Sequence, residues 1–573
     1  MTTTYGCGAG FLSEDIRCQD VFTPEDFSDE HKQIAGTTEQ FVTNELQPVN
    51  DRLEAGDFEL LVAKLRQSAE LGLMMIDAPE EYGGMNLDKA TSMVVTEKLA
   101  WAGNFGLTYM AHTGIGMLPL IYYGTRQQKE RYLEKLVSAE YIGAYSLTEP
   151  DSGSDALGAK TTATLSEDGK HYILNGTKQF TTNTGFADLF TVFAKVDRKY
   201  FTAFLVERNY SGLSFGPEEK KMGLHGSSTR QVILDGVKVP VDNVLGEVGK
   251  GHKIAFNVLN IGRFKLGALC VGQEKYGLAE GARYANERKQ FGVAISTFGA
   301  IKEKLADMTA LTFASEAVVY RLAGMIDSRL ALLDRDSDDY YADYQKGIEE
   351  YAAECALTKV FCTEAAARVI DEMLQVHGGY GYIAEYPIEQ MYRDERVQRI
   401  YEGTNEINRL LIPTLLMRKL PSQQADDAGH FEDEELFGKE RQLLRTMKRT
   451  YLALSGRAAQ KFGDTIGGEQ EVLLALADMA IQIFALESAV LRAGKASFQA
   501  SAARQELYRA VIKICAFTGR SSFITGAEKC ALFLQDEEII AFLAAEAPLG
   551  PCDLLGAKRL LADAVSREEK YIF

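Results

Sequence analysis

Residues 189–196, Leu189-Phe190-Thr191-Val192-Phe193-Ala194-Lys195-Val196, carry the pattern that decides the fold. Aromatic and β-branched side chains fill this run, and a similar run follows at 201–206. Such residues favour extended strands, where they pack well on a pleated surface. Two shorter β-rich runs and two turn dipeptides complete the region: 172–174, 231–234, Asn175-Gly176 and Asp235-Gly236. The sequence therefore predicts a small antiparallel β domain or barrel over residues 142–250.

Helical periodicity dominates on both sides of this β block. On the N-terminal side it runs from Thr23-Pro24-Glu25-Asp26, which resembles a helix start with Pro in the first turn, to about Glu140. It returns at Gly251 and continues to about Leu415. Because strands and helices do not alternate, a Rossmann fold is excluded. The run Gly378-Gly379-Tyr380-Gly381 follows a helical segment, which argues against a dinucleotide fingerprint.

The C-terminal third is set apart by a polar, acidic and nonperiodic stretch at 419–435, which indicates an interdomain linker. An all-helical pattern follows it and continues close to the C-terminus. We therefore predict a mostly α protein with a central small antiparallel β domain and a C-terminal helical domain. The expected parts are 1–28 N-terminal extension, 29–141 N-terminal helical domain, 142–250 middle β domain, 251–418 helical domain, 419–435 linker and 436–573 C-terminal helical domain.

The helix expected at 439–461 carries seven basic residues. They are Lys439, Arg441, Arg445, Lys448, Arg449, Arg457 and Lys461. A solvated basic face is one interpretation, and a peripheral membrane or partner surface is the other.

The composition of the chain limits the classes of function that it can have. The chain has 573 residues, of which 46% are hydrophobic and 25% charged, as in a globular protein of three or four domains. Its formal net charge of −19 argues against nucleic acid and against an anionic membrane surface. The eight cysteines form no CxxC pair, and the seven histidines show no HExxH spacing. We thus expect neither a disulfide framework nor a metal site.

Neither a signal peptide nor a transmembrane segment is expected. Residues 1–20 lack a basic flank followed by an apolar core. The most apolar stretch, 472–491, is interrupted by Asp478 and Glu487 and is typical of a buried helix. A bacterial-type cytoplasmic location with reduced thiols is the corresponding prediction.

The most informative motif for chemistry is Tyr401-Glu402-Gly403-Thr404-Asn405-Glu406-Ile407. Gly403 permits a sharp bend, and Thr404 can cap the following helix. Glu402 is thereby placed on a turn between two helical segments, where a carboxylate is a candidate general base. An ordinary corner between two helices is the alternative.

Three other motifs precede this turn, and the four together resemble the acyl-CoA dehydrogenase family. In order, they are Ala144-Tyr145-Ser146-Leu147-Thr148-Glu149-Pro150-Asp151-Ser152-Gly153-Ser154-Asp155, Arg288-Lys289-Gln290-Phe291-Gly292 and Gln375-Val376-His377-Gly378-Gly379-Tyr380-Gly381. The resemblance covers roughly residues 30 to 415. By its length and helicity, the tail resembles the extension of the very-long-chain branch.

The resemblance implies an FAD-dependent reaction in which Glu402 removes the α proton of an acyl thioester while the flavin accepts the β hydride. Some family members place this glutamate on an earlier helix, immediately before an arginine. Here Gly262 precedes Arg263, so Glu402 stands alone. Burial beside an acyl chain and a flavin is expected to raise the pKa of Glu402.

The resemblance also implies binding residues. Those matched to the cofactor are Tyr145, Leu147, Thr148, Ser154, Phe180, Thr182, Arg288, Phe291, Gln375, Gly379, Thr404 and Glu406. Those matched to the substrate are Ser154, Asn260, Arg263, Tyr401 and Gly403. Arg288, Phe291, Gln375 and Gly379 match groups that reach the FAD of a neighbouring subunit, which implies a homodimer. For the loop at 144–155, a Ser/Gly-rich surface loop is the alternative, and for Arg263 a solvated charge.

The implied activity is oxidation of a long-chain acyl-CoA to the trans-2-enoyl-CoA in fatty-acid β-oxidation, with electrons passed to an electron-transfer flavoprotein. An acyl-CoA oxidase that uses oxygen and a flavin-bearing assembly scaffold are the alternatives. Gly114 and Gly116 fall where the family lines its acyl pocket, so their missing side chains either deepen that pocket or serve helix packing.

Overall fold

The computed structural model describes residues 7–337, 339–419, 436–538 and 552–573, so the expected linker lies, apart from Lys419, outside the described residues. The chain forms two compact units. Unit 1 comprises Met1–Phe27, Leu266–Leu332 and Glu350–Phe573, and unit 2 comprises Ser28–Lys265 and Leu333–Glu349. The long helix α8 (Gly251–Glu287) runs from unit 2 into unit 1.

Unit 2 begins with a layer of helices around an apolar core, in which Leu61, Leu65, Leu99 and Phe105 are fully buried. The helices are α1 (Asp29–Phe41), α2 (Asn50–Glu54), α3 (Phe58–Glu70), α4 (Lys89–Leu99), α5 (Gly103–Met110), α6 (Leu118–Tyr123), α7 (Arg126–Val137) and the later α10 (Tyr340–Glu349). A π-helical turn, Ala111–Gly116, joins α5 to α6. The expected helix start at Thr23-Pro24-Glu25-Asp26 is a single 3-10 turn with a capping box, and α1 begins after it.

The middle of unit 2 is an eight-stranded sheet in the order β6-β7-β3-β2-β4-β5-β8, with β1 paired to β4. The strands are β1 (Gly143–Ser146), β2 (Thr162–Leu165), β3 (His171–Thr182), β4 (Leu189–Val196), β5 (Tyr200–Glu207), β6 (Leu213–Phe215), β7 (Thr229–Pro240) and β8 (Val244–Leu245). Most pairings are antiparallel, but β4 pairs in parallel with both β1 and β2. The near-continuous apolar run in β4 is explained by burial of almost all its side chains.

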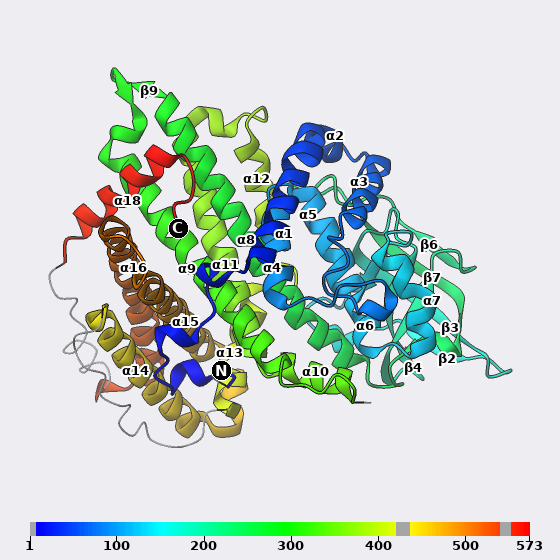
Figure 1. The fold of residues 1–573 in the computed structure, drawn as a ribbon. Coiled ribbons are helices and arrows are strands. Elements are labelled where there is room, and N and C mark those ends of the chain that lie inside the picture. Colours follow the sequence, from blue (N-terminus) through cyan, green and yellow to red (C-terminus); the bar gives the residue numbers. More distant parts are fainter. Residues whose placement is uncertain (1–6, 338, 420–435, 539–551) are drawn as a thin grey trace. The chain divides into compact units, whose positions relative to one another are not determined.

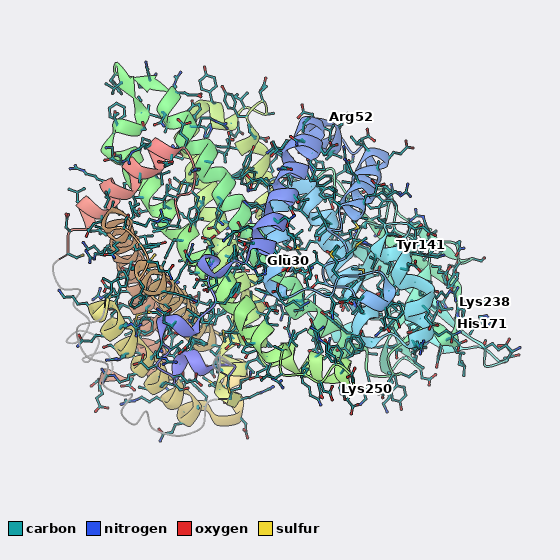
Figure 2. All side chains as sticks on the ribbon, viewed as in Figure 1. Glu30, Arg52, Tyr141, His171, Lys238 and Lys250 are labelled. Atoms are coloured by element: carbon teal, nitrogen blue, oxygen red, sulfur yellow. The ribbon has the colours of Figure 1, made fainter. Side chains whose placement is uncertain are left out.

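Two predicted turns lie inside strands instead. Asn175-Gly176 belongs to β3 and Asp235-Gly236 to β7, and the two strands pair along their length. The register shifts between Leu174 and Gly176, and Gly236 N–H donates to Asn175 Oδ1 at 2.8 Å. These dipeptides therefore form opposed irregularities in one long antiparallel strand pair, because Gly tolerates a bulge as well as a turn. Figure 2 shows His171 of β3 and Lys238 of β7 together at one end of this pair.

Unit 1 is helical, apart from the short hairpin of β9 (Lys289–Gln290) and β10 (Val293–Ala294). Its helices are the second part of α8, α9 (Gly299–Leu330), α11 (Ala352–His377), α12 (Pro387–Glu395), α13 (Asn405–Lys419), α14 (Gly438–Phe462), α15 (Gln470–Ser497), α16 (Ala502–Leu534) and α18 (Leu554–Glu568). The predicted mostly α fold with a central β domain and a C-terminal helical domain is confirmed. Figure 1 shows α15 and α16 side by side in that C-terminal domain.

The N-terminal segment packs on the C-terminal domain within unit 1. The rings of Phe11 and Phe484 meet edge to face, 5.1 Å between centroids. Arg492 of α15 pairs with Glu25 at 3.0 Å and with Glu316 of α9 at 2.6 Å. Burial alone would raise the pKa of Glu316, but Arg492 and Lys275 lower it to about 2. A buried ion cluster thus joins the segment, α9 and α15.

Four of the seven basic side chains of α14 are held by side-chain partners within the chain, while Lys439, Arg449 and Lys461 are exposed. Arg441 is buried and donates to Cys18 Sγ at 2.7 Å, and Arg445 pairs with Asp15 at 3.1 Å. Lys448 pairs with Glu487 at 2.5 Å, and Arg457 pairs with Glu538 at 2.7 Å. The basic face expected for the whole helix is therefore reduced to its exposed residues.

Two helices, α8 and α15, are long and apolar enough to cross a membrane by length and composition. Of their most apolar windows, 89% and 83% respectively is buried inside the protein. Core helices of soluble proteins pass the same test, so this is weak evidence for a membrane span.

Candidate active site

The Glu402 turn in unit 1 has an uncommon backbone. Glu402 adopts φ +57° and Gly403 φ +80°, and α13 begins two residues later at Asn405. A left-handed conformation costs a residue other than glycine about 1–2 kcal/mol, so it persists only where its surroundings hold it. Thr404 Oγ1 accepts the N–H of Ile407 at 3.2 Å, which is the predicted helix cap. The backbone N–H at this helix start lowers the pKa of Glu406.

Side chains from two helices hold the turn. Asn408 Nδ2 donates to the carbonyl oxygens of Gly403 and Thr404, at 2.8 and 3.1 Å. The fully buried Lys359 Nζ of α11 donates to Gly403 O at 2.9 Å and to Asn405 Oδ1 at 2.6 Å. These bonds fix the carbonyl groups that follow Glu402, and so hold the backbone of the turn that carries it.

Tyr401 places a phenol beside the same turn. Its hydroxyl oxygen is buried and makes no hydrogen bond to any part of the chain that the structure describes. Burial raises the pKa of Tyr401 well above its ordinary value, and the neighbouring Cys270 and Glu402 raise it further. The phenol is therefore a protonated donor, and an unpaired buried donor of this kind suits a polar ligand.

A second part of unit 1 forms a cavity of about 540 Å³. It brings together Arg288 and Gly379 of the predicted residues, and its lining is Tyr284, Arg288, Gln290, Ile295, Val376, His377, Gly378, Gly379, Tyr380 and Ile383. A Cβ added at Gly379 would meet no atom within 4 Å, so the wall there is open backbone. Gln375, on the last turn of α11, and Phe291, at the tip of the β9–β10 hairpin, are exposed and stay outside the lining. Phe291 is 94% exposed.

In unit 2, the residues matched to the flavin ring come from β1, the segment that follows it, and β3. Ser146 Oγ and Thr181 Oγ1 lie 3.1 Å apart, and Gln179 N–H donates to Thr148 O at 2.8 Å. These bonds bring Leu147 and Thr148, at the end of β1, beside Phe180 and Thr182 of β3.

Phe180 sits at an irregularity of β3, where the register shifts between Lys178 and Thr181. Its φ is +55° and its side chain is 62% exposed. The bulge therefore turns an aromatic ring outward, as a stacking role requires. Ser154 is also exposed, and Thr182 is half-buried.

The side chain of Tyr145 does not lie where a cofactor-binding residue was expected. Its ring is buried and meets Phe193 edge to face at 5.2 Å, and its hydroxyl donates to Ala255 O at 3.5 Å. The side chain thus belongs to the core, which leaves the backbone of Tyr145 as the group offered to a ligand.

Asn260 and Arg263 are 4% and 6% exposed, and Arg263 Nη1 donates to Asn260 Oδ1 at 3.1 Å. Arg263 is thus no solvated surface charge.

The sequence interpretation missed Lys359 and Asn408 in unit 1, and Lys178 in unit 2. Lys178 is fully buried and donates to Glu149 Oε1 at 2.7 Å and to Leu147 O at 3.1 Å, which fixes the segment after β1. A signal existed for Lys359, because a single lysine interrupts the Ala-rich stretch of α11. Asn408 stands one helical turn after the cap residue, where its amide can reach back to the turn.

Four family descriptions match the chain. They are "Acyl-CoA dehydrogenase, N-terminal domain" over residues 28–140, "Acyl-CoA dehydrogenase, middle domain" over 144–237, and "Acyl-CoA dehydrogenase, C-terminal domain" over 249–416 and, as a second description, over 446–529.

Relatives agree with these matches. A probable acyl-CoA dehydrogenase of Bacillus subtilis is 47% identical over 503 residues, 85% of each chain. The human mitochondrial very long-chain specific acyl-CoA dehydrogenase is 37% identical over 415 residues, which span 70% of this chain but 61% of that protein. A crystal structure of an acyl-CoA dehydrogenase complexed with FAD from Bacillus anthracis superimposes with a TM-score of 0.96, at 43% identity, over 99% of this chain and 100% of that one. The chain therefore belongs to the acyl-CoA dehydrogenase family, oxidoreductases that act on CH–CH bonds.

Proposed function

We propose that this protein oxidises long-chain acyl-CoA to trans-2-enoyl-CoA with FAD, that Glu402 is the base, and that an electron-transfer flavoprotein takes the electrons. The observation that carries the proposal is the Glu402 turn. A carboxylate in a left-handed conformation is held there by Lys359 and Asn408. Strain maintained in this way is typical of functional residues.

The residues present fit FAD. In unit 1, the cavity near Arg288 and the open backbone at Gly379 suit a diphosphate and a nucleoside, because a guanidinium binds phosphate in a bidentate manner. In unit 2, the outward ring of Phe180 suits an isoalloxazine face. FAD is the cofactor in the Bacillus anthracis relative. When bound, the flavin accepts a hydride.

The chain's own residues would hold and move the proton. Glu402 would accept the proton from the α carbon of the thioester, and the negative charge left behind would spread onto the thioester carbonyl oxygen. Donors fixed in advance are the efficient way to stabilise that oxygen. The backbone N–H of Glu402 belongs to the braced turn, so its orientation is set before substrate arrives.

The long-chain preference and the electron-transfer flavoprotein rest on similarity. The human relative named for very-long-chain substrates is 37% identical to this chain, and a second C-terminal domain description extends the family match to residues 446–529. An electron transferring flavoprotein of Acidaminococcus fermentans is the subject of another solved structure, which superimposes on 69% of this chain at 33% identity and a TM-score of 0.61.

We propose a cytoplasmic location for the reaction.

Anaerobic titration of the purified holoprotein with acyl-CoAs of graded length tests the proposal. Bleaching of the flavin by palmitoyl-CoA at lower concentration and higher rate than by octanoyl-CoA is expected. Oxygen consumption during turnover would identify an oxidase instead. A flavin that no acyl-CoA reduces would favour the scaffold.

A further inference from the structure

The hydrogen bonds around the Glu402 turn continue into a chain of ion pairs. Asn405 Nδ2 donates to Glu364 Oε1 of α11 at 3.2 Å. Arg409, one turn further along α13, pairs with the same Glu364 oxygen at 2.7 Å and, through Nε, with Asp478 Oδ1 of α15 at 2.7 Å. A continuous path within unit 1 therefore runs from the C-terminal helical domain to the catalytic turn.

Arg409 is the centre of this path. Its side chain is 16% exposed, and its planar guanidinium is held on two edges by carboxylates from two different helices. A guanidinium fixed in this manner has little freedom to rotate. Without Asp478, only Glu364 would hold the guanidinium of Arg409. We expect the Glu364 carboxylate to move with that guanidinium, which would weaken the hydrogen bond between Glu364 and Asn405.

We propose that Asp478 is a positioning residue for the dehydrogenation, acting through Arg409, Glu364 and Asn405 on the turn that carries Glu402. The inference rests on the proposed function, because the role of Glu402 as base belongs to it. It gives the C-terminal helical domain a part in the reaction beyond added stability.

The chain offers a matched control. Asp563 of α18 pairs with Lys302 of α9 at 2.5 Å, so it too joins the C-terminal domain to a dehydrogenase helix. Its side chain is 53% exposed, and that of Asp478 is 44% exposed. Asp478→Asn and Asp563→Asn each remove one partly exposed carboxylate from an equivalent position, and neither opens a cavity.

The first experiment measures the limiting rate constant for anaerobic flavin reduction by palmitoyl-CoA in three holoprotein variants: Asp478→Asn, Asp563→Asn and Asp478→Glu. Asp478→Asn is expected to lower it about three- to tenfold, because small misplacements of a catalytic group are costly. FAD content and the Kd for acyl-CoA are expected to stay unchanged. Asp563→Asn and the conservative Asp478→Glu are expected to remain within about twofold of the wild type.

The second experiment follows hydrogen–deuterium exchange of the backbone amides at 397–410, which does not depend on activity. Faster exchange there in Asp478→Asn than in Asp563→Asn is expected, since the turn loses part of its support. Equal rate constants and equal exchange in the two variants would overturn the positioning role.

The two proposals fail separately. Normal flavin reduction in Glu402→Gln would remove the base, whatever Asp478 does, and the exchange comparison would still decide whether Asp478 supports the turn. Loss of reduction in Glu402→Gln, with no difference between Asp478→Asn and Asp563→Asn, would keep the base and reject the positioning residue.

Discussion

Glu402 combines two properties at one residue: a carboxylate that is half-buried and a backbone that a glycine would adopt more readily. Replacing it by glycine would relieve the backbone strain but remove the proposed base, so the strained carboxylate supports that proposal. The glutamine variant keeps the shape of the side chain and changes only its ability to accept a proton.

Glu402→Gln is therefore expected to retain FAD and to bind acyl-CoA, while the rate constant of flavin reduction falls about 10²–10⁴-fold, as for a lost general base. Stopped-flow absorbance at the flavin band measures it. Glu389→Gln, a carboxylate of α12 paired with Arg393 on its own helix, is the control and should reduce at the wild-type rate. A Glu402→Gln rate within tenfold of the wild type would assign the base elsewhere.

His112 is a second residue whose state is set by burial. Gly143 N–H donates to its Nδ1 at 2.9 Å, so its Nε2 carries the proton and donates to Leu136 O at 3.0 Å. Burial lowers the pKa of His112 to about 4, the bond to Leu136 opposes this, and Lys265 adds to it. The neutral ring thereby anchors the start of β1, the strand that leads to Thr148.

Because the folded pKa of His112 lies below its unfolded value, its neutral form stabilises the protein above pH 6.5, and this contribution is lost as pH falls towards 4. From pH 8 to pH 5 the free energy of unfolding should fall by roughly 2 kcal/mol on account of this group. Denaturant unfolding of the wild type and His112→Gln at both pH values measures it. The variant should lose less stability on acidification. Equal losses would show that the ring titrates normally.

At the scale of elements, the π-helical turn Ala111–Gly116 distinguishes two glycines that the sequence treats alike. A Cβ at Gly116 would lie 2.8 Å from Ala111 O and 3.0 Å from the carbonyl carbon of Gly143, both backbone atoms. A Cβ at Gly114 would meet only Lys265 Cδ, at 3.7 Å, an ordinary contact. Gly116 thus serves close packing between the turn and β1, which supports the packing alternative for that residue.

Gly116→Ala is accordingly expected to lower the free energy of unfolding by about 1–3 kcal/mol, as for overpacking. It should reduce activity on palmitoyl-CoA and octanoyl-CoA alike. Gly114→Ala, the matched variant, should be neutral or slightly stabilising, since alanine favours helix by ~1 kcal/mol. Denaturant unfolding and the two activities measure this. A Gly116→Ala protein as stable as the wild type, with activity lost only on palmitoyl-CoA, would show that Gly116 lines the acyl pocket instead.

Local sequence patterns predicted the strands, the helices and the Glu402 turn. They did not predict contacts between residues that are far apart in the sequence. The apolar run 189–196 has the bounds of β4, and Thr404 caps α13, because both depend on neighbours in the sequence. Asn175-Gly176 was predicted to form a turn, but it forms an irregularity inside β3, since bulges and turns need the same backbone freedom. Asp478 was visible only as an interruption of an apolar helix. Its partner Arg409 lies 69 residues away, and only tertiary packing brings the two together.

At the scale of the whole molecule, unit 1 exposes apolar side chains around the Arg288 cavity. Phe291 is 94% exposed and Tyr382 84%, with Tyr380, Ile383 and Val293 between 43% and 45%. A cluster of this kind on one face indicates a surface that another chain covers. Because the same face carries the residues matched to a neighbouring subunit's FAD, we infer that the partner is a second copy of this chain. The resemblance of Arg288, Phe291, Gln375 and Gly379 to groups that reach a neighbouring subunit's FAD implies a homodimer, so the homodimer is the predicted assembly.

Phe291→Ser should therefore weaken the dimer and the retention of FAD together, since one surface serves both. Light scattering at micromolar concentration, with the flavin to protein absorbance ratio after gel filtration, measures the two effects. Phe498→Ser is the control: Phe498 is 72% exposed after α15, away from the hairpin in sequence and outside the cavity lining, and its loss should change neither quantity. A wild-type tetramer would contradict the predicted homodimer. A Phe291→Ser protein that stays dimeric with full FAD would place the subunit interface on another face, and the exposed ring at the hairpin tip would then need a different partner.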